Sequence, residues 1–199
     1  TSGALIVLDA EDGAVLGMAT YPTYDLKDYS KNYDKLAADE NAPLLNRATV
    51  GLYRPGSTFK TITATAGLNE GIVNGSSTYY CGHTYDYKGQ IFGCTGSHGD
   101  ISVVQALQYS CNIYFYKLSE ELTIDNLTKY AELYGLGQPT GIETGDAAGR
   151  FANPETYAEY GWDWTVGHVL QAAIGQSETA VTPLQMAVVA NTIANEGVR

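Results

Sequence analysis

Two residues in the first third of the chain have the spacing that nucleophilic catalysis needs. Ser57 is followed three positions later by Lys60, directly after the turn residues Arg54-Pro55-Gly56. If a helix begins at this turn, the two side chains share one face and the lysine can reach the serine hydroxyl. The lysine can accept the serine proton only when it is neutral, which requires burial that lowers its pKa from about 10.4 toward 7–8. The spacing therefore predicts an activated serine, at a helix N-terminus that favours a developing oxyanion.

The pair by itself does not decide the chemistry, since a serine three residues before a lysine recurs by chance. In the alternative reading, Ser57 only caps a helix and Lys60 lies on its solvated face. A further polar group, Ser110-Cys111-Asn112, favours catalysis, because a hydroxyl can relay a proton and an amide can hold both the lysine and a substrate carbonyl. The same spacing at Ser30-Lys31-Asn32 lies in a polar segment without an adjacent apolar element, so we give it no role.

The apolar pattern predicts the strands that must support these residues. Two short apolar runs, residues 4–8 and 14–19, flank an Asp-Gly and predict a β-hairpin. Residues 22–46 are polar, contain two prolines and predict a long surface loop. Residues 78–95 predict a second hairpin that turns near Lys88-Gly89.

Helix start signals follow at regular intervals. Ser57 and a Gly71 stop predict a helix that ends at Asn69. Further helices are expected to begin at three capping residues: Ser102, Thr123 and Thr182. Strands at the start of the chain and helices after them predict an α+β fold.

Length and charge narrow the function classes. The 199 residues suit a single domain with a real core and are too few for two independent ones. The net charge of −11 argues against a nucleic-acid partner, because such a surface repels phosphate. No apolar run is long enough to span a membrane and no signal peptide opens the chain, so we expect any anchor to lie outside it.

Longer segments resemble the transpeptidase domain of class B penicillin-binding proteins. Residues 53–60, Tyr-Arg-Pro-Gly-Ser-Thr-Phe-Lys, together with Pro-Leu-Leu-Asn-Arg-Ala at 43–48, are similar to that family's first catalytic motif, and residues 110–116 are similar to its second. The opening hairpin also matches, and the matches follow the family's order from one end of the chain to the other. Two further similar segments lie at 134–142 and 173–187.

The resemblance implies a penicillin-binding transpeptidase fold like that of serine β-lactamases, with an antiparallel sheet and helices. It implies that Ser57 attacks the D-Ala-D-Ala carbonyl of a peptidoglycan stem peptide, or a β-lactam ring, and forms an acyl-enzyme. Lys60 would be the base, Ser110 and Asn112 would relay protons and position substrate, and the Ser57 backbone N–H would form half of the oxyanion hole. No cofactor is implied. The expected partners are cell-wall synthesis proteins, at the extracytoplasmic face of the bacterial membrane, with a membrane-anchored parent protein.

The chain departs from the family's pattern in two places. The third motif, Lys-Thr-Gly or Lys-Ser-Gly, does not occur in residues 1–199, so we expect a single, C-terminally truncated domain that is a poor enzyme alone. Ser177-Glu178 replaces a frequent glycine, and we expect only a local loop change there. Two alternative functions stay open: a β-lactam sensor or serine β-lactamase, and a catalytically inactive binding module.

The cysteines allow three arrangements. Cys81, His83, Cys94 and His98 could supply four zinc ligands, although their spacing is not that of a standard zinc finger. A Cys81–Cys94 disulfide across the second hairpin and a pair of free thiols are the alternatives, and we assign no metal. Cys111 is expected to be a small buried residue beside the site.

Overall fold

The computed structural model describes all 199 residues, which divide into two compact units. Unit 1 comprises Thr1–Tyr53, Tyr134–Gly149 and Ala180–Arg199, and unit 2 comprises Arg54–Leu133 and Arg150–Thr179. The strands form two antiparallel hairpins and the rest of the regular structure is helical, which confirms the α+β prediction. The expectation of a single domain stays a prediction.

The predicted opening hairpin is present in unit 1. Strand β1 (Gly3–Leu8) pairs antiparallel with β2 (Val15–Tyr21). The connecting turn is closed by the Asp9 N–H, which donates to the Ala14 carbonyl at 2.8 Å. Gly13 has φ +74°, a conformation that a residue without a Cβ adopts at no steric cost. The glycine of the Asp-Gly pair therefore indicates the turn, because the turn requires a positive φ at this position.

The prediction of a loop over residues 22–46 is wrong, because a short helical segment lies inside this range. The 3-10 helix η1 (Leu26–Asp28) leads directly into α1 (Tyr29–Ala37). Asp25 starts this segment by accepting a hydrogen bond from the Lys27 N–H at 2.9 Å. The two prolines that suggested a loop, Pro22 and Pro43, lie outside the helix and do not interrupt it.

Helix α7 (Pro183–Ala194) begins in unit 1 at the predicted capping box. The Thr182 hydroxyl accepts from the Gln185 N–H at 3.1 Å, and the Gln185 side chain accepts from the Thr182 N–H at 2.8 Å. This reciprocal pair satisfies two backbone donors that a helix start leaves open. The helix packs against β1.

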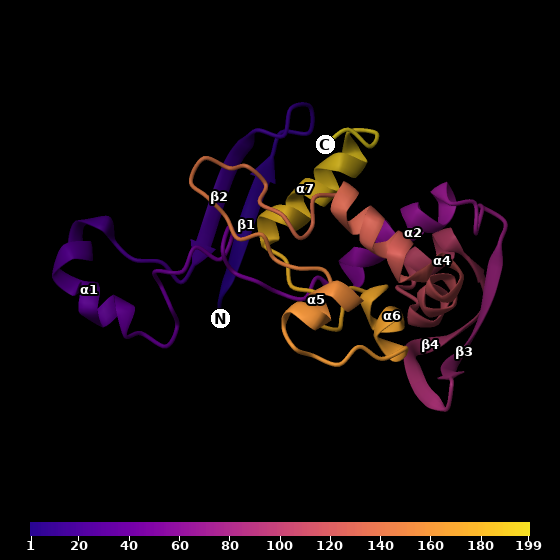
Figure 1. The fold of residues 1–199 in the computed structure, drawn as a ribbon. Coiled ribbons are helices and arrows are strands. Elements are labelled where there is room, and N and C mark those ends of the chain that lie inside the picture. The colour runs from indigo at the N-terminus through magenta and orange to yellow at the C-terminus, as the bar shows by residue number, and fades with distance from the viewer. The chain divides into compact units, whose positions relative to one another are not determined.

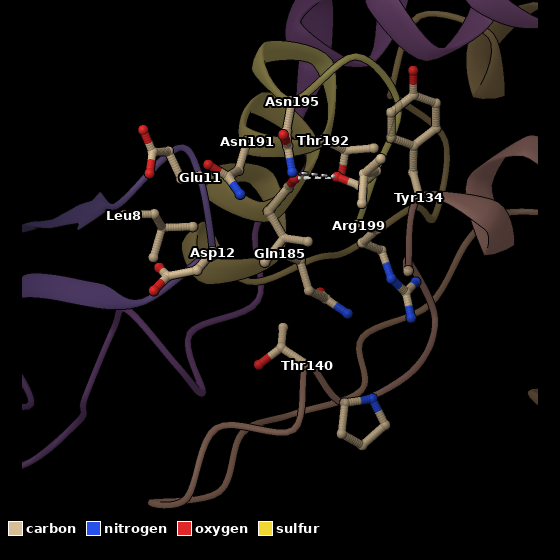
Figure 2. Close-up of a pocket in the computed structure, with 15 residues that line it drawn as sticks. Leu8, Glu11, Asp12, Tyr134, Thr140, Gln185, Asn191, Thr192, Asn195 and Arg199 are labelled. Carbon is tan, nitrogen blue, oxygen red and sulfur yellow. Dashed lines mark hydrogen bonds between the residues drawn. The ribbon is translucent and has the colours of Figure 1, made fainter.

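Unit 1 also encloses a cavity of about 410 Å³, shown in Figure 2. Its lining comes from the end of β1 and the turn after it, from residues 134–140, from α7 and from the residues that follow α7. Glu11, Asp12 and Arg199 contribute charged groups, and Asn191 and Asn195 contribute amides. None of the predicted catalytic residues lines this cavity, since all four belong to unit 2.

In unit 2 the chain enters its first long helix through a tighter turn. The 3-10 helix η2 (Gly56–Phe59) continues into α2 (Lys60–Asn69), which ends where Gly71 takes φ +70°. The N-cap of η2 is Pro55 and not Ser57, so the expected N-cap role of Ser57 is wrong. The 3-10 geometry explains this result, because Ser57 already lies inside a helical turn and not before it.

Helix α4 (Asn112–Leu133) lies beside α2, as Figure 1 shows. It follows α3 (Val103–Gln108), which has the predicted Ser102–Gln105 capping box. Thr123 interrupts the helical backbone of α4 with φ 69° and ψ 163°, close to the position where a new helix start was predicted. The sequence signal at Thr123 therefore marks a real break between two helical stretches.

The second hairpin closes the other side of the unit 2 core. Strands β3 (Thr78–Tyr87) and β4 (Gln90–Ser102) pair antiparallel around the predicted Lys88-Gly89 turn, and α4 packs against both. Helices α5 (Pro154–Glu159) and α6 (Gly167–Ala172) complete the unit. No helix in the chain has the length and apolar character needed to cross a membrane. The unit 2 core includes several fully buried aromatic and aliphatic residues: Ile101, Ile113, Tyr114, Phe115, Leu118 and Leu170.

Candidate active site

The nucleophile candidate and the base candidate meet at the junction of η2 and α2. Ser57 is exposed, whereas Lys60 is only 1% exposed. The Lys60 ammonium donates to the Ser57 hydroxyl at 3.2 Å. Phe59, which is fully buried, fixes the turn between them. The 3-10 turn thus presents the hydroxyl to solvent while its partner lies in the interior.

Ser110 and Asn112 approach the same lysine from the start of α4. Lys60 Nζ lies 2.7 Å from the Ser110 carbonyl oxygen, 3.0 Å from the Ser110 hydroxyl and 2.7 Å from Asn112 Oδ1. Ser110 takes φ +52°, which turns its carbonyl and its hydroxyl toward the lysine. The structure therefore brings together all four residues that the sequence analysis named.

The surroundings of Lys60 favour its neutral form. Burial lowers the pKa of Lys60 to about 8, an effect that the nearby Cys94 and Cys111 partly oppose. The Ser110 carbonyl and Asn112 Oδ1 can only accept hydrogen bonds, so they engage two N–H groups. In the neutral amine the remaining lone pair then faces the two hydroxyl groups. This arrangement suits transfer of the Ser57 proton to Nζ.

Asn112 is held in one orientation from three sides. Its backbone N–H donates to Cys94 Sγ at 3.2 Å, and its side-chain Nδ2 donates to the Gly93 carbonyl at 3.3 Å. Its Oδ1 accepts from Lys60. Because Nδ2 is tied to β4, Oδ1 must point toward the lysine. Strand β4 therefore sets the geometry of the second polar group.

A cluster of sulfur and nitrogen atoms lies directly behind Asn112. It consists of Cys81, Cys94, His98 and Cys111, whose ligand atoms all lie within 4.8 Å of one another. His98 Nδ1 is 3.4 Å from Cys81 Sγ and 3.8 Å from Cys94 Sγ, and Cys94 Sγ is 3.7 Å from Cys111 Sγ. A tetrahedral zinc site with ordinary bond lengths separates its ligand atoms by about 3.5–3.8 Å. The donor set and spacing could therefore hold zinc.

Two sequence predictions about this cluster are corrected. All three cysteines are free, so Cys81 and Cys94 form no disulfide. His83 is exposed and is replaced in the cluster by Cys111. The strand pairing shifts register around His83, where φ is +79°, and this bulge breaks the alternation that would have placed His83 on the same face as Cys81.

The thiols of the cluster differ in their acidity. Burial opposes ionisation of Cys94, yet the backbone N–H groups of Ile113, Gly96 and Asn112 lower the pKa of Cys94 to about 6. Burial raises the pKa of Cys111 to about 12. Backbone N–H donors to sulfur are the kind of outer support that orients metal-ligating thiolates.

The sequence analysis missed what supports the nucleophile turn. The Gly56 N–H donates to the Gly175 carbonyl at 2.9 Å, and both glycines have positive φ. The sequence offered one signal for this contact: Gly56 and Gly175 both lie in segments that resemble the same family. Neither segment says that the two backbones touch.

Comparisons with known proteins place this site in a family. Residues 3–199 match the family model described as the penicillin binding protein transpeptidase domain. The chain is 31% identical, over 98% of its length, to the peptidoglycan D,D-transpeptidase MrdA of Acinetobacter baumannii, of which it covers 31%. The chain thus spans about a third of the length of the curated relatives it matches.

Two solved structures have the same fold. Penicillin-binding protein PBP2 of Helicobacter pylori, in complex with MreC, is 29% identical, with a TM-score of 0.91 over 98% of this chain and 38% of that one. Penicillin-binding protein A of M. tuberculosis, solved as an imipenem acyl-enzyme complex, is 27% identical, with a TM-score of 0.85 over 98% of this chain and 46% of that one. The chain belongs to the penicillin-binding protein transpeptidase domain family, within class B.

Proposed function

We propose that this chain is the part of a peptidoglycan D,D-transpeptidase that carries the acylated serine, and that β-lactams acylate the same residue. The observation that carries the proposal is the buried Lys60 amine, which lies within hydrogen-bond distance of both the Ser57 and Ser110 hydroxyls. Its lowered pKa makes about one-tenth of it neutral at pH 7. A relative named as a D,D-transpeptidase and a neighbour solved as an acyl-enzyme support the assignment.

The first half-reaction follows from the geometry. Ser57 Oγ attacks the carbonyl carbon of the D-Ala-D-Ala bond while its proton passes to Lys60 Nζ. The Ser57 backbone N–H stabilises the negative charge on the carbonyl oxygen. The C–N bond then breaks, and the leaving D-alanine takes a proton that Lys60 delivers through the Ser110 hydroxyl. The product is an ester between Ser57 and the shortened stem peptide.

The second half-reaction returns the serine. An amine from a neighbouring stem peptide attacks the ester carbonyl, its proton passes through the same hydroxyl and amine, and Ser57 leaves with the proton it had lost. Asn112, which is fixed by β4, holds the substrate carbonyl and the lysine together. In a β-lactam the broken C–N bond belongs to the ring, so the leaving amine stays attached to the acyl-enzyme.

A direct test is transfer activity in the intact protein that contains this chain. The protein should release D-alanine from a D-Ala-D-Ala peptide and join the remainder to an added amine, whereas Ser57→Ala should do neither. Lys60→Ala should slow acylation by roughly 10²–10⁴-fold, the usual effect of removing a general base. Acylation of Lys60→Ala at the parent rate would show that another group takes the proton.

The alternative functions separate on the fate of the acyl-enzyme. A serine β-lactamase hydrolyses it and turns over penicillin, while a sensor stays acylated without any transfer activity. A catalytically inactive binding module is not acylated at all. Rapid deacylation by water would favour the lactamase, and absence of any adduct on Ser57 would favour the binding module.

The partners and the cellular location follow from the same proposal. Stem peptides lie outside the cytoplasm, so we place the active site at the extracytoplasmic face of the bacterial membrane, in a membrane-anchored parent protein. Other cell-wall synthesis proteins are the expected partners, in keeping with the H. pylori relative solved with MreC. Co-purification of the intact protein with cell-wall synthesis proteins tests this assignment.

We also propose that Cys81, Cys94, His98 and Cys111 bind one zinc ion with a structural role. Four protein ligands close a tetrahedral site and leave no position for substrate. The metal would fix β3, β4 and the start of α4 together, and so the residue Asn112. One equivalent of zinc in the purified protein supports the proposal, and metal-free protein with three titratable thiols contradicts it.

A further inference from the structure

The backbone of the turn that carries Ser57 contacts the loop of residues 174–179. Gly56 donates its N–H to the Gly175 carbonyl at 2.9 Å. A Cβ placed on Gly175 would lie 2.4 Å from the Gly56 carbonyl oxygen and 2.7 Å from Phe59 Cβ. The two backbones are therefore in direct contact, with no side chain between them. A displacement of the loop at Gly175 would therefore act directly on the turn that presents Ser57.

The loop is itself anchored on its far side. The Ser177 hydroxyl lies 2.6 Å from the Tyr157 hydroxyl, and Arg150 Nε donates to the Glu178 carbonyl at 2.9 Å. Ser177 has φ +60°, a conformation that residues with a Cβ rarely adopt. The hydrogen bond to Tyr157 offsets part of this backbone cost.

The Glu178 carboxylate joins the loop to the turn through a second route. Arg54 Nη2 donates to Glu178 Oε1 at 3.0 Å, and Arg150 Nη2 lies 4.0 Å from Oε2. Arg54 is two residues before Gly56. Arg150 is held in place by the rings of Tyr160 and Trp162, whose centroids lie 5.3 and 5.5 Å from its guanidinium carbon. Glu178 thus links the turn to a side chain that is fixed elsewhere.

The solvent exposure of the Arg54–Glu178 ion pair indicates that it affects the position of the turn more than the stability of the fold. The Arg54 and Glu178 side chains are 54% and 36% exposed, and ion pairs this open contribute little to folding stability. A weak, exposed ion pair can still favour one position of a turn. Catalysis is sensitive to small displacements of the nucleophile, even to those that hardly change the free energy of unfolding. The expected signature is therefore a change in rate without a matching change in stability.

We propose that Glu178 is a positioning residue for acylation: it binds Arg54 and thereby keeps the Ser57 turn in contact with the Gly175 backbone. The inference rests on the proposed acylation of Ser57. It predicts that Glu178→Gln, which preserves shape and removes charge, lowers the first-order acylation constant three- to tenfold while the affinity of the preceding complex changes less than twofold. Arg54→Met should give the same loss.

The experiment uses labelled penicillin and the intact protein, with acylation resolved into affinity and first-order rate. The matched control is Glu70→Gln, which breaks the 2.8 Å ion pair between Glu70 and Lys129 at the other end of α2. Arg54→Met combined with Glu178→Gln should be no slower than the slower single variant, because each change already breaks the connection from Arg54 through Glu178 to Arg150. Arg54→Lys should recover part of the rate.

Several results would overturn the inference. The first is a Glu178→Gln rate within twofold of the parent, or equal to that of Glu70→Gln. The second is a loss confined to affinity or to melting temperature, and the third is a double variant whose loss is the product of the single losses. In each case Ser57 is still labelled, so the proposed function survives. A parent protein without label on Ser57 overturns both.

Discussion

Replacing Asn112 by aspartate tests how the site controls the proton on Lys60. Asn112 Oδ1 accepts from Lys60 Nζ at 2.7 Å, and aspartate places a carboxylate oxygen at the same position. The negative charge stabilises the ammonium form, so it raises the pKa of Lys60 above its present value of about 8. Because acylation needs the neutral amine, the variant should acylate fast only at higher pH.

The size of the effect follows from the two pKa values. In the parent protein the acylation rate should fall tenfold for each unit below pH 8 and level off above it. An opposite charge within hydrogen-bond distance raises a pKa by about 1–3 units. The midpoint of the rate profile should therefore move up by the same amount, and the rate at pH 7 should fall by about 10- to 1000-fold.

The assay is stopped-flow acylation by labelled penicillin across the range from about pH 6 to 10. Asn112→Leu is the control, since it removes the amide without adding a charge. Both variants lose the contact to substrate and should have lower plateaus, but only the aspartate should move the midpoint upward. A midpoint that is the same in the aspartate variant and in the parent would refute the role of neutral Lys60.

Three further predictions concern the lysine, the loop and the thiol cluster. The parent should gain up to about 3 kcal/mol of unfolding free energy relative to Lys60→Met between pH 8 and 10.5. The reason is that only the unfolded chain keeps the Lys60 proton in this pH range. Urea melts that give the same difference at every pH would contradict this prediction. Tyr157→Phe should lower the free energy of unfolding by about 1 kcal/mol, because it removes the hydrogen bond to Ser177. Ser177→Gly should leave it nearly unchanged, because glycine loses the same hydrogen bond but relieves the strain of φ +60°. Equal losses in the two variants would show that this backbone is not strained. Elemental analysis should find no zinc in His98→Ala and a full equivalent in His83→Ala; equal contents in both would remove the assignment.

The parts of the fold that the sequence predicts well are those governed by local rules. The Asp-Gly turn before β2 and the capping box at Thr182 each depend on a few adjacent residues, and the structure has both. The loop prediction over residues 22–46 failed because it rested on the many polar residues and the two prolines, whereas Asp25 and the spacing of Tyr29 and Tyr33 favour a helix. A short exposed helix leaves little apolar pattern for sequence reasoning to detect.

The candidate catalytic residues could be named from the sequence, but only part of their geometry could be predicted. The spacing of Ser57 and Lys60 holds in the 3-10 turn as it would in an α-helix, so the contact was foreseeable. The contribution of the Ser110 carbonyl was not, since it depends on a positive φ at a residue with a Cβ. The position of Cys111 in the thiol cluster was also not predictable, because it requires knowing that the chain before α4 lies against β4.

The measurement that tests the central claim most directly is the location of the covalent β-lactam adduct. The intact protein is incubated with penicillin, digested, and mapped by mass spectrometry alongside Ser57→Ala. One adduct on the peptide that contains Ser57, stable over the time of the experiment and absent from Ser57→Ala, is the expected result. An adduct on another residue, or an equal adduct in Ser57→Ala, would contradict the assignment of Ser57 as the nucleophile.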